Sequence, residues 1–169
     1  MLLYPKIYLE KVTDLSKETV FENKIKGIIL DVDNTLLDFD KNLLPNADAW
    51  CEELKKDGIK LIIVSNSNKE EKVKSVAEKL DIPYVFFAIK PFKKGFKKAK
   101  QILELEADEI AVIGDQIFTD VLGANRMKMF PILVKPLAEK DYFITIIKRP
   151  LENLIIKKYM KSITKEKEK

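Results

Sequence analysis

The chain has 169 residues, of which 46% are hydrophobic and 34% charged, with one cysteine and no histidine. This composition predicts one globular domain over residues 1–169 and excludes a disordered chain, an internal disulfide, and any catalytic or zinc site that requires imidazole. The net charge of +4 equals the surplus of six lysines over two glutamates in residues 157–169, so the rest of the chain is near neutral. No nucleic-acid partner is therefore expected.

No apolar run approaches the ~18 residues of a membrane span, and the first residues lack the pattern of a secretory signal. A single cysteine, Cys51, is consistent with a reducing compartment. We therefore expect a cytoplasmic protein.

In chain order, the first 24 residues predict an edge segment and a short helix that begins near Thr13 or Ser16. That helix is expected to pack three side chains against the body: Leu15, Val20 and Phe21. No function is assigned to this part of the chain.

Five short apolar runs rich in Ile and Val then predict strands that are covered on both faces. Between them, apolar residues recur at helical spacing in about four segments, for example at Ala47, Trp50, Cys51 and Leu54. Strands that alternate with helices indicate a doubly wound, mainly parallel α/β sheet. The predicted strands are residues 27–30, 60–65, 84–89, 109–114 and 130–134, and the other predicted inward-facing helical residues are Val73, Val76, Ala77, Leu80, Phe96, Ala99 and Leu103.

Polar side chains follow four of these strands, where the carboxyl ends of a parallel sheet gather ligands. They offer carboxylates for a divalent cation, together with hydroxyl and ammonium groups for an anion. In order they are Asp31, Asp33 and Thr35, then Ser65 and Asn66, then Lys90, and finally Asp115 and Asp120.

Each piece has an ordinary structural explanation when it stands alone. Asp-x-Asp-x-Thr is common in turns, Ser65 and Asn66 could cap the next helix, and Asp120 could favour a helix N-terminus. An EF-hand that starts at Asp31 is excluded because Leu36 stands where glycine is required. The combination, at successive strand ends and in a consistent order, favours a functional site.

The motifs "DVDNT", "VSN", "IKP" and "GDQIFTD" resemble the four motifs of the haloacid-dehalogenase-like (HAD) phosphatase superfamily, over about residues 25–135. Through "ILDVDNTLL", "KP" and "GDQIFTDVLGANR" the chain looks closest to the YqeG group of subfamily IIIA. That group is similar to phosphatidylglycerophosphate phosphatases. The resemblance implies a Rossmann-like HAD core and an Mg²⁺-dependent phosphomonoester hydrolase.

In this chemistry a carboxylate attacks a phosphate dianion, which requires a nearby cation. Asp31 would attack phosphorus to form an aspartyl-phosphate, and Asp33 would protonate the leaving oxygen and later activate water. The resemblance implies that Mg²⁺ is held by Asp31, the backbone carbonyl of Asp33 and Asp115, with Asp120 binding through water or holding the arrangement in place.

The phosphate would be bound by three further residues. Ser65 would donate its hydroxyl to a phosphate oxygen, and Lys90 would neutralise charge on the phosphate and the nucleophile. Asn66 would support these two residues, and Thr35 would support the acids. Arg126 is either a contact to a distal phosphate or headgroup or a structural residue.

The intervals between Asp33, Ser65 and Lys90 hold one helix and one strand each, so no cap domain is expected. An uncapped site admits large substrates, and phosphatidylglycerophosphate or another surface-bound phosphoester is the favoured substrate.

The alternative functions are a phosphatase of a soluble metabolite or macromolecule and a phosphate-binding module without turnover. A phosphate-accepting receiver domain is disfavoured because the third strand here ends in Lys90. The oligomeric state is left open.

A C-terminal helix and basic tail are expected over about residues 150–169, with entry at Pro150. Leu151, Leu154, Ile155 and Tyr159 are expected along one side. Either this helix packs on the sheet and ends in a frayed tail, or its lysines contact anionic lipid at the inner membrane face.

Overall fold

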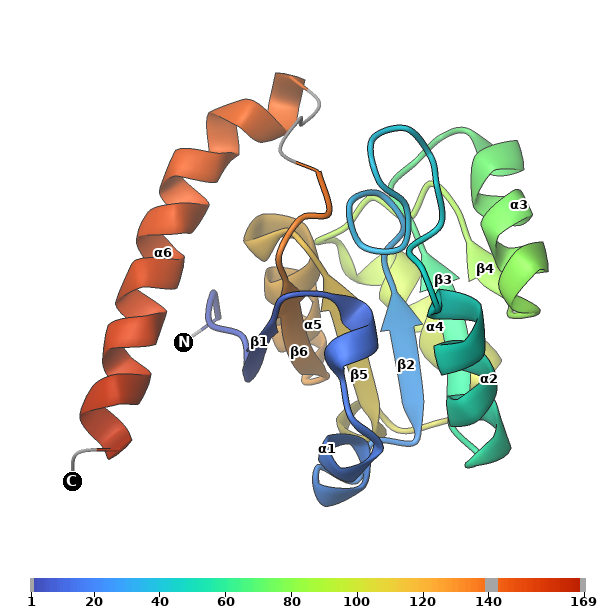
Figure 1. Ribbon diagram of the computed structural model, residues 1–169, viewed down its shortest axis with the longest axis horizontal. Coiled ribbons are helices and arrows are strands. Elements are labelled where there is room, and N and C mark those ends of the chain that lie inside the picture. The colour runs from blue at the N-terminus through green and yellow to red at the C-terminus, as the bar shows by residue number, and fades with distance from the viewer. Residues whose placement is uncertain (1, 139–142, 168–169) are drawn as a thin grey trace.

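The computed structural model describes residues 2–138 and 143–167. Its centre is a six-stranded sheet in the order β1-β6-β5-β2-β3-β4 (Figure 1), and every neighbouring pair of strands is parallel. The strands are β1 (Ile7–Leu9), β2 (Gly27–Leu30), β3 (Lys60–Val64), β4 (Tyr84–Val85), β5 (Ile110–Gly114) and β6 (Phe130–Val134). The predicted doubly wound α/β fold is confirmed.

Helices cover both faces of the sheet (Figure 1). One face carries α1 (Lys17–Glu22), α2 (Ala47–Lys56) and α3 (Glu70–Leu80), and the other carries α4 (Lys93–Leu103) and α5 (Leu122–Met127). Shorter helical turns are η1 (Val12–Asp14), η2 (Ala107–Glu109) and the π-helical turn η3 (Ile117–Val121).

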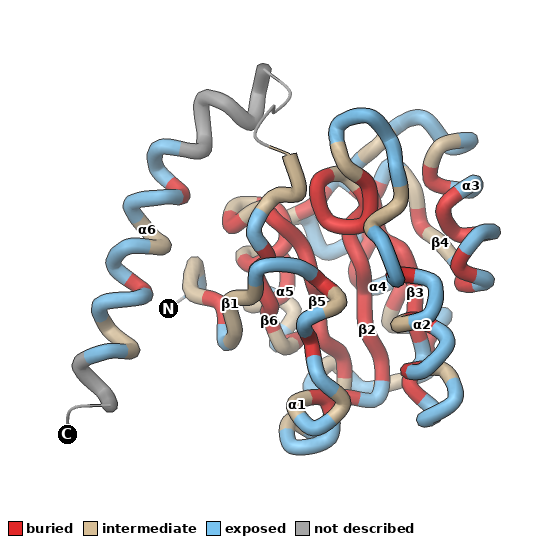
Figure 2. Tube along the Cα trace, viewed as in Figure 1, coloured by how far each residue is buried: buried red, intermediate tan, exposed pale blue. Residues whose placement is uncertain are grey.

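The strands are continuous apolar runs because successive side chains enter two different cores. Ile28 and Leu30 pack beneath α1, α2 and α3, whereas Ile29 packs beneath α4 and α5. Figure 2 shows the buried strands at the centre of the molecule, with exposed residues on the outer sides of the helices. A strand buried on both faces has no polar side, so it lacks the alternating pattern of a half-exposed strand.

The helical periodicity is confirmed at all of its predicted inward positions except Trp50, which is only half-buried. The Trp50 indole nitrogen donates a hydrogen bond to the Leu15 carbonyl oxygen at 3.2 Å, so its polar atom is satisfied at the margin of the core. Among the described residues, α2 and β3 fill the interval after Asp33, and α3 and β4 fill the interval before Lys90. No cap domain is inserted there.

Two expectations for the sheet and its N-terminal approach were wrong. The run 84–89 forms a strand only over Tyr84–Val85, because the chain then adopts positive φ angles at Phe87 and Ile89, which a strand cannot accommodate. In α1, Ser16 is the N-cap and Val20 is buried, but Phe21 is 55% exposed. A six-residue helix has one inward stripe, and Phe21 lies beside it.

The C-terminal helix α6 (Phe143–Lys167) runs along the β1 side of the body (Figure 1). Pro150 is inside α6, so the predicted entry at Pro150 was wrong. The end of the predicted basic tail, residues 168–169, lies outside the described residues. None of the described helices is both long enough and apolar enough to cross a membrane.

The inner face of α6 is held by Ile155, Ile156 and Tyr159. The Tyr159 hydroxyl donates to the Lys6 carbonyl oxygen at 3.2 Å. Leu151 and Leu154 are 53% and 49% exposed, which corrects the expectation that they share a buried side with Ile155 and Tyr159. The buried side of α6 is centred on Glu152, Ile156 and Tyr159. The helical rotation of 100° per residue places Leu154 on the opposite side of the helix and Leu151 about a quarter turn from Tyr159.

Cys51 lies on the inner face of α2, and burial raises the pKa of its thiol to about 12. At about pH 8 only roughly one molecule in ten thousand then carries a thiolate. The folded protein should therefore fail to react with a disulfide reagent such as dithionitrobenzoate, whereas the unfolded chain should release one equivalent of chromophore.

The control is Cys51→Ser, which should release none in either state. Rapid stoichiometric reaction of the folded protein would contradict the burial of this thiol.

Candidate active site

The two strands that carry the acidic motifs are neighbours in the middle of the sheet. From β2 the chain proceeds to β3 and β4 on one side and then crosses to β5 on the other side. The register pairs Leu30 with Ile113, and the Asp31 amide donates to the Ile113 carbonyl oxygen at 2.9 Å. Asp31 and Asp115 therefore leave adjacent strands at the topological switch point, where the carboxyl ends of open α/β sheets bind ligands.

Three carboxylates converge at this switch point. Asp31, Asp115 and Asp120 each offer an oxygen, and these oxygens lie within 4.8 Å of one another. All three side chains are buried, with residue exposures of 8%, 2% and 1%. Ligand oxygens around an octahedral Mg²⁺ ion are roughly 3 to 4 Å apart, so this donor set fits a small divalent cation.

Lys90 lies against two of these acids. Its Nζ atom donates to Asp31 Oδ1 at 2.6 Å and to Asp120 Oδ1 at 2.7 Å. Burial raises the pKa of Asp31 to about 7, although the Lys90 ammonium opposes this change. For Lys90, burial favours the neutral amine, but Asp120 and Asp31 outweigh it and the net pKa is raised. The ammonium form of Lys90 thus neutralises part of a crowded negative charge.

Asn66 holds the backbone of Lys90 on both sides. Its Oδ1 atom accepts the Lys90 amide at 2.6 Å, and its Nδ2 atom donates to the Lys90 carbonyl oxygen at 3.1 Å. Both hydrogen-bonding ends of the Asn66 side chain therefore bind the backbone of Lys90.

The loop between Asp115 and Asp120 is closed tightly by its own side chains. Asp120 Oδ2 accepts the Gln116 amide and the Thr119 hydroxyl, both at 3.2 Å. A Cβ atom on Gly114 would lie 2.2 Å from the Asp120 carboxyl carbon. Glycine is required at this strand end so that Asp120 can fold back over it.

Asp33 lies at the edge of the acid cluster and is paired with a residue that lies outside all four sequence motifs and was not predicted. Lys72, in the first turns of α3, places Nζ at 2.5 and 2.7 Å from the two Asp33 oxygens. The side chains of Asp33 and Lys72 are 33% and 15% exposed, so the pair borders solvent. The Asp33 carboxyl group is therefore accessible, and it can leave Lys72 to contact a substrate atom without first leaving the protein interior.

Ser65 and Thr35 are buried at the same edge of the sheet. The Ser65 oxygen accepts the Ser67 amide at 3.1 Å, which leaves the hydroxyl hydrogen to be donated to an anion. Neither Ser65 nor Asn66 caps α3, because the N-cap of that helix is Lys69.

A second missed residue, Glu152, reaches the acidic loop from α6. Its Oε1 atom accepts the Ile117 amide at 2.8 Å and the Phe118 amide at 3.3 Å, and the residue is only 2% exposed. These amides are the first two of η3, which have no partner within their own turn. Glu152 therefore anchors the loop between Asp115 and Asp120 to the C-terminal helix.

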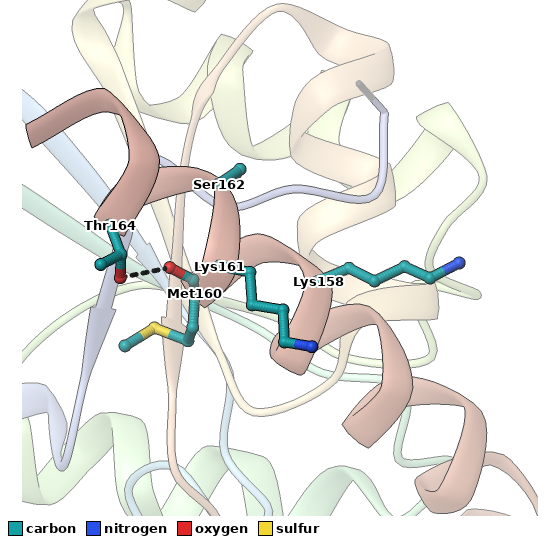
Figure 3. A pocket seen from close by; sticks show the side chains of 5 residues that line it. All are labelled: Lys158, Met160, Lys161, Ser162 and Thr164. Carbon is teal, nitrogen blue, oxygen red and sulfur yellow. Dashed lines mark hydrogen bonds between the residues drawn. The ribbon is translucent and has the colours of Figure 1, made fainter. Parts of the chain in front are cut away.

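Two other features do not join the cluster. Arg126 is exposed in the last turn of α5, after the chain has turned back from the carboxyl edge, so the structure does not bring it to the acids. A hollow on the outer side of α6 (Figure 3) is lined by Lys158, Met160, Lys161, Ser162 and Thr164 and contains no carboxylate.

Replacing Glu152 by Ala should release the two η3 amides. We expect hydrogen exchange at Ile117 and Phe118 to accelerate by about tenfold or more and the free energy of unfolding to fall by about 1–3 kcal/mol, because a buried acceptor is lost. Glu152→Gln should retain most of the protection, since its amide oxygen can still accept.

The matched control is Asn153→Ala, which alters the exposed neighbour on the same helix. Unchanged protection of both amides in Glu152→Ala would show that α6 does not anchor this loop.

Comparison with known proteins gives relatives along most of the chain. The family described as "Mitochondrial PGP phosphatase" matches residues 1–137. The "Probable phosphatase YqeG" of Bacillus subtilis (strain 168) is 43% identical over 153 residues, covering 90% of this chain and 88% of that protein. The "Phosphatidylglycerophosphate phosphatase 1, chloroplastic/mitochondrial" of Arabidopsis thaliana is 22% identical, and the match spans 93% of this chain but only 48% of that protein.

Solved structures agree in fold. An uncharacterized protein from Listeria monocytogenes serotype 4b has a TM-score of 0.57 at 21% identity, covering 70% of this chain and 85% of that one. A HAD phosphatase from Thermococcus onnurineus has a TM-score of 0.51 at 24% identity, covering 60% and 51%. The solved structures support the fold alone, whereas the sequence relatives identify the family. The sequence relatives therefore confirm the predicted resemblance. The chain belongs to the mitochondrial PGP phosphatase family and is a HAD-type phosphatase of the YqeG group.

Proposed function

We propose that the protein is an Mg²⁺-dependent phosphomonoester hydrolase that forms an aspartyl-phosphate on Asp31. The observation that carries this proposal is the convergence of three buried carboxylates with the Lys90 ammonium at one strand edge. Carboxylates attract a cation and the ammonium attracts the phosphate, so both partners of the reaction are drawn to the same place.

In this proposal Asp31, Asp115 and the Asp33 backbone carbonyl hold the magnesium ion, and Asp120 supports the set. When bound, the ion supplies the positive charge that lets a carboxylate approach a phosphate dianion. The oxygen donors fit this hard cation, and the described chain has no histidine or thiolate at the cluster that would favour a softer metal.

Asp31 then attacks phosphorus from the end of β2, and the bond to the leaving oxygen breaks. Asp33 gives its proton to that oxygen and afterwards takes one from the water that hydrolyses the aspartyl-phosphate. Because Asp33 is paired with Lys72 at the rim, the substrate must compete with this ion pair. Ser65 and Lys90 bind phosphate oxygens, and Asn66 keeps Lys90 in position.

The favoured substrate is phosphatidylglycerophosphate or another phosphoester held at a surface. The printed names of the family and of the plant relative support this choice, and the absence of an inserted cap between the described motifs leaves the rim open to a large molecule. We further propose a cytoplasmic protein with peripheral contact at the inner membrane face, to which the exposed Lys157, Lys158 and Lys161 of α6 can contribute.

Hydrolysis of an aryl phosphate should require Mg²⁺ and should fall by at least about a thousandfold in Asp31→Asn, because the nucleophile is lost. The isosteric Asp33→Asn should also impair turnover but still allow a burst of phosphoryl transfer with a good leaving group. The measurement is release of the aryl alcohol, with circular dichroism of each variant as the folding control.

The same assay ranks substrates. The wild-type protein should turn over phosphatidylglycerophosphate in preference to free sugar phosphates, and equal rates would contradict the lipid preference. Absence of hydrolysis with every phosphoester, with Mg²⁺ present, would instead indicate a phosphate-binding module.

A further inference from the structure

Three large apolar side chains stand exposed around Lys90. Phe87, Ile89 and Phe92 are 57%, 48% and 60% exposed, whereas Lys90 between them is 5% exposed. The segment thus turns its lysine inward to Asp31 and Asp120 and its apolar side chains outward. We call Phe87, Ile89 and Phe92 the apolar rim.

The backbone holds the apolar rim in this position. Phe87 and Ile89 have φ angles of 48° and 52°, a conformation that is unfavourable for bulky residues and especially for a β-branched one. The Phe87 amide donates to the Ser67 carbonyl oxygen at 2.9 Å, and the Phe92 amide donates to the Ile89 carbonyl oxygen at 3.0 Å. The exposed side chains therefore belong to a turn whose strained backbone is fixed by hydrogen bonds.

A basic surface continues directly from the apolar rim. Residues 82–103 contain six lysines and no acidic residue, and four of those lysines are exposed on α4: Lys93, Lys94, Lys97 and Lys98. A Cβ atom on Gly95 would lie 2.6 Å from Ala88, so α4 packs closely against the turn. The apolar rim and these four lysines form one continuous surface.

We propose that this surface docks the protein on an anionic lipid membrane, with the apolar rim inserted among the lipids and the α4 lysines on the headgroups. This inference rests on the proposed function. It adds that the phosphate group of the substrate is located within that membrane. Apolar side chains beside lysines are the two features by which a protein binds such an interface. The membrane would then lie over the entrance to Lys90 and Asp31.

A soluble polyanion fits the observations less well, since it would be bound by the lysines alone and would leave the apolar rim in water. Glu70 begins α3, which packs on the face of the sheet opposite to α4, and its carboxylate accepts the Tyr84 hydroxyl at 3.0 Å.

The test is co-sedimentation of the full chain with two kinds of vesicle, one of phosphatidylcholine mixed with phosphatidylglycerol and one of phosphatidylcholine alone. The wild-type protein should bind the anionic vesicles more strongly. The combined change Phe87→Ala, Ile89→Ala and Phe92→Ala should weaken that binding by about tenfold or more, as should Lys94→Glu with Lys98→Glu. Phe21→Ala is the matched control, because Phe21 is 55% exposed at the amino edge of the sheet and should leave binding unchanged.

Hydrolysis of a soluble aryl phosphate should stay within about twofold of wild type in the rim variant, since none of its three residues contacts the acids. Failure of the wild type to bind anionic vesicles, or full binding by the rim variant, would overturn the proposal. Loss of binding in the lysine variant alone would also overturn it and would indicate a soluble polyanion. Because sedimentation does not depend on turnover, an inactive wild-type protein that still binds through the rim would refute the proposed function and not this surface.

Discussion

Three buried carboxylates around one ammonium group set the main constraint on this protein. Asp31, Asp115 and Asp120 would repel one another if all were ionised in a water-poor site. The pKa of Asp31 is raised first by its burial and further by the nearby Asp120 carboxylate. Lys90 offsets part of it through two short hydrogen bonds. The excess of negative charge that remains is what makes the cluster suited to a divalent cation.

Several elements of the fold keep these groups together. The switch point between β2 and β5 brings Asp31 beside Asp115, Asn66 fixes the backbone of Lys90, and Gly114 allows Asp120 to fold back. Glu152 adds an anchor from α6, far along the chain from the motifs. The acids are therefore held in place by several elements of the fold.

The sequence predicted the parts of the site that lie directly after buried strands. Asp31, Ser65 and Asp115 each follow an uninterrupted apolar run, and parallel strands must bring such positions to one edge. Lys72 was missed because a lysine in the first turn of a helix resembles an ordinary surface residue. Glu152 was missed because one acid among apolar residues on a helix does not reveal which distant amides it accepts.

The errors have a similar origin. Residues 84–89 read as a strand because their composition is apolar, yet positive φ angles turn Phe87 and Ile89 outward. Pro150 read as a helix start because local signals favour it there, whereas α6 begins at Phe143. Local patterns identify which residues are apolar or helix-starting, but tertiary contacts decide which of them are covered.

The most direct measurement is the position of a bound cation in a crystal of the full chain grown with Mn²⁺, located by its anomalous scattering. We expect one ion within about 2.3 Å of a carboxylate oxygen of Asp31 and of Asp115, with Lys90 still hydrogen-bonded beside it. An ion bound elsewhere, or carboxylates of Asp31 and Asp115 too far apart to share one, would contradict the account.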